Sequence, residues 1–141
     1  MRAFLDTSAL VKLYDPNESG VAALENNLIP VTRIVLSQLA RVEFVSAFQR
    51  KVQLGDLQPQ QAAAVVAAFS QVQAEYDWVA LSEPILAHAA HLLVVHSSLR
   101  LRSLDAIQLA CALAPDSSTS IFFSHDQRLV SAAQASGLRT G

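Results

Sequence analysis

The 141-residue sequence has little of several features that mark particular classes of protein. It holds one cysteine, Cys111, so no internal disulfide can form and no zinc site can be built from several thiolates. It has no run of about 18 apolar residues, the length that spans a membrane. The apolar stretch within residues 1–10 is too short for a signal peptide. We therefore expect a cytoplasmic protein with no membrane partner, in a reducing compartment.

Charge is scarce as well. Charged residues make up 16% of the chain and apolar residues 52%, and the formal net charge is −2. The molecule as a whole has no positive field to attract nucleic acid, although a local basic rim can surround an acidic centre. The apolar residues suffice for the core of one domain over residues 1–141. This composition also suggests that a partner, either a second copy or another protein, covers part of the apolar surface.

Short apolar segments alternate with helical segments along the chain. The apolar segments lack polar alternation, which indicates strands buried on both faces of a parallel sheet. The order of segments predicts an α/β fold in which helices flank a central, mostly parallel sheet. The expected strands span residues 2–6, 33–37, 77–81 and 120–124, with 138–140 as an added edge strand. The expected helices span residues 7–13, 18–27, 37–54, 58–76, 82–96, 103–114 and 126–136.

Several predicted helix ends carry residues that favour such ends. Ser37, Ser82 and Ser103 begin helical segments and are expected to act as N-caps. Gly55 and Gly137 stand just past the last residues of helical segments, where glycine is favoured. These signals set the predicted boundaries of the helices.

Four acidic residues fall where a parallel sheet binds ligands, outside the carboxyl ends of its strands. Asp6 ends the first predicted strand and Asp126 follows the fourth. Asp105 lies in the first turn of a predicted helix. Glu43 lies inside the helix after the second strand, where its neighbours at three and four residues are small or apolar, so it is not on an evidently charged face.

Three of these acids have a purely structural alternative. Asp6 and Asp126 can be helix N-caps, and Asp105 can favour the positive end of a helix dipole. Glu43 caps nothing, and a nearly buried carboxylate needs a partner, a proton or a metal. Four carboxylates drawn together would repel one another, and a hard cation such as Mg²⁺ or Mn²⁺ would remove that conflict. Such an ion suits the hydrolysis of a phosphodiester bond.

Four stretches of the sequence also resemble, in order, the motifs of a known family: "FLDTSALVKLY", "LARVEFVSAF", "LRSLDAIQLACAL" and "FFSHDQRL". The chain is similar to the PIN domain, and within it to the VapC-type ribonuclease toxins of prokaryotic toxin–antitoxin pairs. The resemblance runs from residue 3 to about residue 137. It implies a single PIN-like α/β/α sandwich, an acidic pocket for Mg²⁺ or Mn²⁺, and metal-dependent endonucleolytic cleavage of RNA. It further implies a homodimer and a cognate, VapB-like antitoxin that binds DNA.

The resemblance assigns roles to seven residues. Those that match the acidic quartet, and are thereby catalytic and metal-binding candidates, are Asp6, Glu43, Asp105 and Asp126. It implies that the first three contact one ion and that Asp126 completes the pocket or helps a second ion. Small hydroxyl residues beside the acids are Thr7, Ser8 and Ser124. Three arginines lie next to the acids in the sequence and are candidates for contacts with flanking RNA phosphates, with ordinary solvated surface as the equal alternative: Arg100, Arg102 and Arg128.

Other functions compete with this one. A phosphotransferase of the haloacid-dehalogenase type also uses an acid at the end of its first strand, but it needs a second acid two residues later, where this sequence has Ser8. His88 and His91 have the spacing of one helix face, but a zinc site would need a third ligand. A PIN-like scaffold that binds without cutting, and a PIN nuclease that processes RNA without being a toxin, remain as alternatives.

Overall fold

The computed structural model describes all residues from 1 to 141 and contains one sheet of five strands, all of them parallel. The strand order is β3-β2-β1-β4-β5. This confirms the predicted parallel sheet, including the edge strand near the C-terminus. The strands are β1 (Arg2–Leu5), β2 (Arg33–Ser37), β3 (Asp77–Val79), β4 (Ile121–Phe123) and β5 (Arg139–Thr140).

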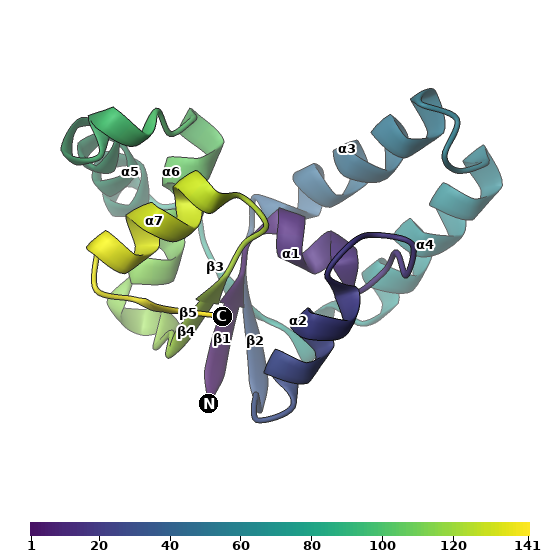
Figure 1. Ribbon diagram of the computed structural model, residues 1–141, viewed down its shortest axis with the longest axis horizontal. Helices are drawn as coiled ribbons and strands as arrows, with labels where there is room; N and C mark the ends of the chain where they lie inside the picture. The colour runs from purple at the N-terminus through teal and green to yellow at the C-terminus, as the bar shows by residue number, and fades with distance from the viewer.

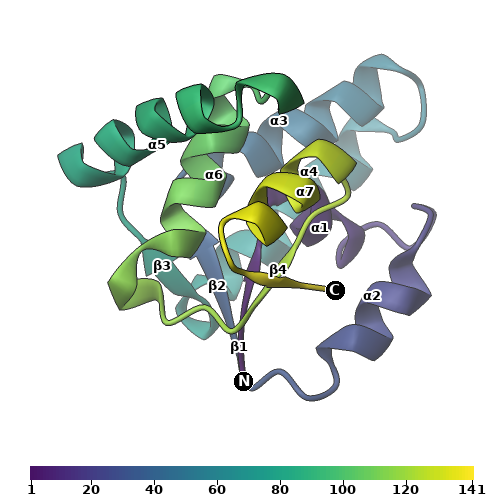
Figure 2. The ribbon, with the colours of Figure 1, turned by 60° about the vertical axis from the view of Figure 1, so that its left-hand side comes forward.

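Seven α-helices cover the two faces of the sheet, so the molecule is an α/β/α sandwich as predicted (Figure 1). One face carries α1 (Thr7–Lys12), α2 (Val21–Leu28), α3 (Ala40–Gln53) and α4 (Pro59–Gln71). The other carries α5 (Glu83–Val95), α6 (Ser103–Leu113) and α7 (Gln127–Ala135). Figure 2 shows α6 and α7 packed over this second face. None of the seven helices combines the length and the apolar character needed to cross a membrane.

The strand β1 is buried on both faces, which explains its continuously apolar sequence. Ala3 and Leu5 point into the core beneath α1–α4, whereas Phe4 points into the core beneath α5–α7. All three side chains are fully buried. Phe4 stacks on Phe122 of the neighbouring strand, with ring centroids 5.8 Å apart. A strand with a core on each face cannot alternate polar and apolar residues, so the absence of alternation correctly indicated this position.

Helix boundaries confirm part of the capping prediction. The Ser82 hydroxyl accepts a hydrogen bond from the Ile85 N–H at 3.4 Å and caps α5 as expected. Gly55 and Gly137 lie past helix ends with φ of 82° and 93°, the left-handed region that glycine adopts without strain. The prediction for Ser37 is wrong. It ends β2, paired in register with Val79, and α3 begins three residues later at Ala40.

The prediction for Ser103 is also wrong by one position. Ser103 is the first residue of α6 and not its cap, because Arg102 has the extended backbone of an N-cap residue. The Arg102 N–H donates to Asp105 Oδ2 at 3.2 Å. The acid in the first turn thus accepts from the N–H of the cap residue, which is its part in a capping box.

The strand order reverses at β1, because later strands are added on both of its sides. The chain runs from β1 outward to β2 and β3, then returns to form β4 on the other side of β1. The carboxyl ends of β1 and β4 lie side by side, and the Asp6 N–H extends their ladder by donating to the Phe123 carbonyl at 3.1 Å. Ligands of open parallel sheets bind at such a switch point. Two of the predicted acids come just after these strands: Asp6 is the next residue after β1, and Asp126 is the third residue after β4.

Candidate active site

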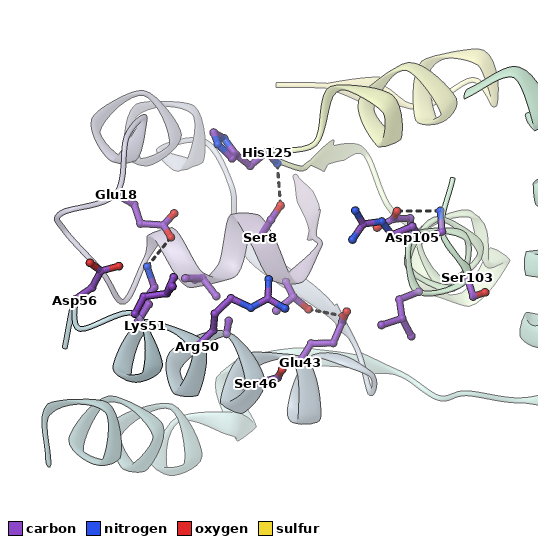
Figure 3. Close-up of a pocket in the computed structure, with 16 residues that line it drawn as sticks. Ser8, Glu18, Glu43, Ser46, Arg50, Lys51, Asp56, Ser103, Asp105 and His125 are labelled. Atoms are coloured by element: carbon purple, nitrogen blue, oxygen red, sulfur yellow. Dashed lines mark hydrogen bonds and ion pairs between the residues drawn. The ribbon is translucent and has the colours of Figure 1, made fainter. Parts of the chain in front are cut away.

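A cavity of about 750 Å³ opens at this end of the sheet (Figure 3). Residues of α1, α3 and the first turn of α6 line it, together with the loops after α1 and α3. Two of the four predicted acids, Glu43 on α3 and Asp105 on α6, are among the lining residues. Thr7 and Ser8, two of the predicted hydroxyl residues, also line it. Asp6 and Asp126 are not lining residues, so their contacts decide how they relate to the cavity.

Asp6 is held by hydroxyl groups and backbone beneath this cavity. Its Oδ1 accepts from Ser8 Oγ at 2.7 Å and from the Ala9 N–H at 3.0 Å, and its Oδ2 accepts from Ser124 Oγ at 2.6 Å. The side chain therefore caps α1, as one interpretation of the sequence proposed. Asp6 is only 5% exposed. Burial, with a smaller contribution from the nearby Glu43 carboxylate, raises its pKa to about 6 despite the hydrogen bonds that lower it.

Ser124 connects Asp6 with the fourth acid of the predicted quartet. Its hydroxyl donates to Asp6 and accepts from the Asp126 N–H at 3.0 Å. Asp126 caps α7, because its Oδ1 accepts from the Arg128 N–H at 2.9 Å. The Ser8 hydroxyl accepts from the His125 N–H at 2.9 Å and fixes the same loop. Asp126 is thus linked to Asp6 through Ser124, and its own side chain caps α7.

Glu43 is bound by two neutral donors. Its Oε1 accepts from Thr7 Oγ1 at 2.8 Å and from Gln108 Nε2 at 2.7 Å. Gln108 also donates to Thr7 Oγ1 at 3.0 Å. Gln108 was not among the residues predicted from the sequence. A signal was present, because Gln108 is a polar residue in an apolar run and stands three residues after Asp105, on the same helix face.

Cations surround the other end of the cavity. Lys51 Nζ lies 2.8 Å from Asp15 Oδ2 and 2.8 Å from Glu18 Oε1, and Lys12 Nζ lies 3.6 Å from Glu18 Oε2. Burial alone would raise the pKa of Asp15, but the hydrogen bond from Lys51, the Asn17 N–H and the charge of Lys51 together lower it. Figure 3 shows Lys51 and Glu18 at this end, away from Glu43 and Asp105.

The arginines differ in their relation to the cavity. Of the three predicted phosphate contacts, only Arg102 lines it. Arg128 pairs with Asp126 through Nε and Oδ1 at 3.6 Å, and Arg100 lies in a left-handed turn after the short 3₁₀ turn Ser97–Leu99. The structure adds Arg50, which lines the cavity between its two ends and forms no ion pair (Figure 3). Its spacing of seven residues from Glu43, two helical turns, was the available signal.

The potential metal ligands around Asp6, Glu43 and Asp105 are oxygen atoms of carboxylates and hydroxyls, and such oxygen ligands suit a hard divalent cation. No three His, Cys, Asp or Glu side chains converge closely enough to hold one ion by themselves. Mg²⁺ does not require that number, since it usually keeps several waters and is bound through one or two carboxylates with substrate phosphates. Glu43 and Asp105 line the cavity and neither forms an ion pair, so the residues present fit such an ion chemically.

Two other sequence features have structural explanations. Cys111 is fully buried in α6 and donates to Ser37 Oγ at 3.3 Å, and burial raises the pKa of its thiol. His96 is buried, with Nε2 3.2 Å from Ser136 Oγ, so it joins the end of α5 to the end of α7. His88 and His91 belong to no group of metal-ligating side chains.

Comparison with solved structures shows the same architecture in several proteins. VapC20 from Mycobacterium tuberculosis, described as a sarcin–ricin loop cleaving toxin, aligns with a TM-score of 0.71 at 16% identity, over 96% of this chain and 95% of that one. VapBC2 from Rickettsia felis, bound to a promoter DNA fragment, aligns with a TM-score of 0.68 at 12% identity, over 100% and 98%. FitAcB from Neisseria gonorrhoeae gives 0.67 at 16% identity, over 98% and 95%. At these identities the likeness establishes the fold.

The sequence itself identifies the family. No curated protein sequence matches the chain significantly. The sequence model of the PIN domain, in contrast, matches residues 3–134, which is nearly the whole chain and includes all four predicted acids. The fold, the switch-point cavity and this match agree, and the chain belongs to the PIN domain family.

Proposed function

We propose that this protein is a metal-dependent endoribonuclease, the VapC-type toxin of a type II toxin–antitoxin pair. The observation that carries the proposal is the acidic end of the cavity, which we define as Glu43 and Asp105 in its lining together with Asp6, which is buried near Glu43. These three carboxylates surround the switch point of a PIN fold and form no ion pair with any lysine or arginine. Carboxylates left without a cation at a ligand-binding position fit a site for Mg²⁺ or Mn²⁺.

Within this proposal, Glu43 and Asp105 hold the ion from α3 and α6, and Asp6 contributes directly or through water from the end of β1. The ion, when bound, supplies an activated water and neutralises charge that develops on the scissile phosphate. Thr7 and Gln108 hold Glu43 in place, and Ser8 and Ser124 hold Asp6. Asp126 stays at the rim through Ser124, where it completes the pocket.

The substrate would enter along the cavity. Arg50 and Arg102 line it beside the acids, and a guanidinium can hold a phosphate by two parallel hydrogen bonds. Phosphate contacts of this kind position a nucleic acid without reading its sequence. They also supply the local basic rim that the net charge of −2 does not exclude.

The partner proposed for the chain is a VapB-like antitoxin, and the proposed assembly contains two copies of the toxin. Support for the antitoxin comes from the similar structures, which include VapBC-1 from Haemophilus influenzae and a toxin–antitoxin complex from Klebsiella pneumoniae. Exposed apolar side chains lie on α3, at Val42 and Val45, and on α6, at Leu104, which also lines the cavity. They agree with the covered surface expected from the composition.

The test is cleavage of an RNA pool by purified, partner-free protein in Mg²⁺ or Mn²⁺ and in EDTA. We expect cleavage that requires the metal and is lost in Asp105→Asn. Asp56→Asn is the matched control, because Asp56 lines the same cavity from an exposed loop outside the acidic end. Folded protein that cuts no RNA in either metal, or that cuts equally well in EDTA, would contradict the proposal and favour a binding scaffold.

A further inference from the structure

Gln108 occupies a position where an apolar residue would be expected. It lies on α6 within the run "LDAIQLACALA", and its side chain is only 3% exposed. Its Nε2 donates to Thr7 Oγ1 and to Glu43 Oε1, while Thr7 donates to the same glutamate oxygen. The three side chains form a closed set of hydrogen bonds that joins α1, α3 and α6.

The charge of Glu43 fixes which way the Gln108 amide faces. In the opposite orientation the amide carbonyl would point at the Glu43 carboxylate, and two acceptors would repel each other. In the observed orientation the amide oxygen is buried and has no hydrogen-bond partner. A buried acceptor without a donor is unfavourable, so packing alone would favour an apolar residue of similar size here. The glutamine is therefore explained by its two donated bonds.

Those bonds restrain one oxygen of Glu43 and leave the other available. Oε1 accepts from both Thr7 and Gln108, whereas Oε2 accepts from no protein donor. Glu43 lines the cavity, so the unrestrained oxygen is the one available to a ligand there. Both donors are neutral, and the carboxylate keeps its full negative charge. A lysine or arginine in the same place would hold the side chain equally well but would offset that charge.

We propose that Gln108 is a positioning residue that fixes the Glu43 carboxylate for a divalent cation in the cavity. The inference rests on the proposed function, because it assigns Glu43 to that ion. Gln108 also stands three residues after Asp105 on α6. One helix thereby contributes an acid to the cavity and, on the same face, the amide that orients the acid opposite.

The test compares Gln108→Met with the wild type in the full-length chain. Methionine fills a similar volume and donates nothing. We expect Mn²⁺ affinity, measured by calorimetry, to fall at least about tenfold, as is typical when a group that supports a ligand is lost. The melting temperature in EDTA should stay the same or rise, because the variant removes the unpartnered buried oxygen. A crystal structure of the metal-free variant should show the Glu43 carboxylate moved or in several positions.

Two further variants separate positioning from general packing. Cys111→Ala removes a buried side chain from the same helix without touching Glu43, so its melting temperature should fall and its Mn²⁺ affinity should not change. Thr7→Val removes the other donor to the same oxygen. Combined with Gln108→Met, it should lower the affinity by a factor that differs from the product of the two single effects, because both act on one atom.

The outcomes that overturn the inference are distinct from failure of the proposed function. Unchanged Mn²⁺ affinity in Gln108→Met, or a lower melting temperature with the Glu43 side chain unmoved, overturns the role of Gln108 while the nuclease stands. A wild-type protein that neither binds Mn²⁺ nor cuts RNA overturns both. A wild type that cuts with metal, beside a variant with weakened binding and a displaced Glu43, supports both.

Discussion

The two ends of the cavity hold carboxylates in opposite ways. At the ion-paired end, which we define as Lys12, Asp15, Glu18 and Lys51, each acid has a lysine within 4 Å. At the acidic end, the acids receive hydrogen bonds only from hydroxyls, an amide and the backbone. Asp6 and Asp15 show the result most clearly. Both are buried, at 5% and 8% exposure, yet the pKa of Asp6 is raised and that of Asp15 is lowered.

The difference indicates what each end is for. Lys51 joins the loop after α1 to α3, so the charges at the ion-paired end hold the wall of the cavity together. Neutral donors at the acidic end fix the side chains without neutralising them. A carboxylate that is positioned but not compensated can still attract a cation from solution. Four experiments would break or sharpen this comparison.

The largest effect is expected from replacing one glutamate at each end with glutamine. Glu43→Gln should lower the rate of RNA cleavage at least about 100-fold, because several kcal/mol of charge stabilisation at the ion would be lost. Its melting temperature should change little, since an amide oxygen can still accept from Thr7 and Gln108. Glu18→Gln is the counterpart in the same cavity and should keep cleavage while losing stability. A loss of cleavage in both variants would contradict the distinction between the two ends.

A smaller effect is expected from removing the shared cation of the ion-paired end. Lys51→Met leaves Asp15 and Glu18 without their closest partner, and breaking a partly buried pair is destabilising. Because these groups are partly solvated, we expect the free energy of unfolding to fall by about 1–3 kcal/mol. Urea unfolding followed by circular dichroism measures it. Arg50→Met, next to it on α3, is the control and should leave stability unchanged.

Arg50 is expected to affect substrate binding alone. It lines the cavity, forms no ion pair, and lies about 10 Å along the helix axis from Glu43 at a rise of about 1.5 Å per residue. Arg50→Ala should raise KM for RNA by about tenfold, the effect of losing one charged hydrogen bond, with kcat nearly unchanged. Steady-state kinetics at two salt concentrations would show it. Arg128 lies outside the cavity, so Arg128→Ala should leave KM unchanged. An equal rise in KM in that variant would mean that the overall positive charge, and not the position of Arg50, sets RNA binding.

The smallest effect is the pH dependence of stability in EDTA. Asp6 has a folded pKa of about 6, above its usual 3.8, so it destabilises the fold when ionised; this cost begins to decrease as pH falls through about 6 and is gone below its usual value of 3.8. Asp15 has a lowered pKa, so its contribution is present above its usual value and is lost at lower pH. The free energy of unfolding should increase as pH falls from about 6 to about 4, and should decrease at lower pH. In Asp6→Asn the rise should be absent; a persistent rise would assign it to another group.

The sequence predicted most of the fold because its signals are local. Continuous apolar strands indicated a sheet buried on both faces, and β1 confirms it with Ala3, Phe4 and Leu5. Ser82 was a reliable cap for the same reason, since a cap bonds to backbone three residues away. Ser37 failed because pairing with β3 kept it in a strand, and strand pairing joins residues that are distant in the chain.

The candidate site divides in the same way. The sequence by itself determined which acids follow strands and helix starts, since Asp6, Glu43, Asp105 and Asp126 are fixed by the order of the elements. Only the tertiary structure decided their contacts. Gln108 meets Glu43 across 65 residues, and Ser124 meets Asp6 across 118. The physical reason is that a carboxylate is governed by whatever charge or dipole the fold brings within a few ångströms, and for Asp6 and Asp15 these neighbours gave opposite results.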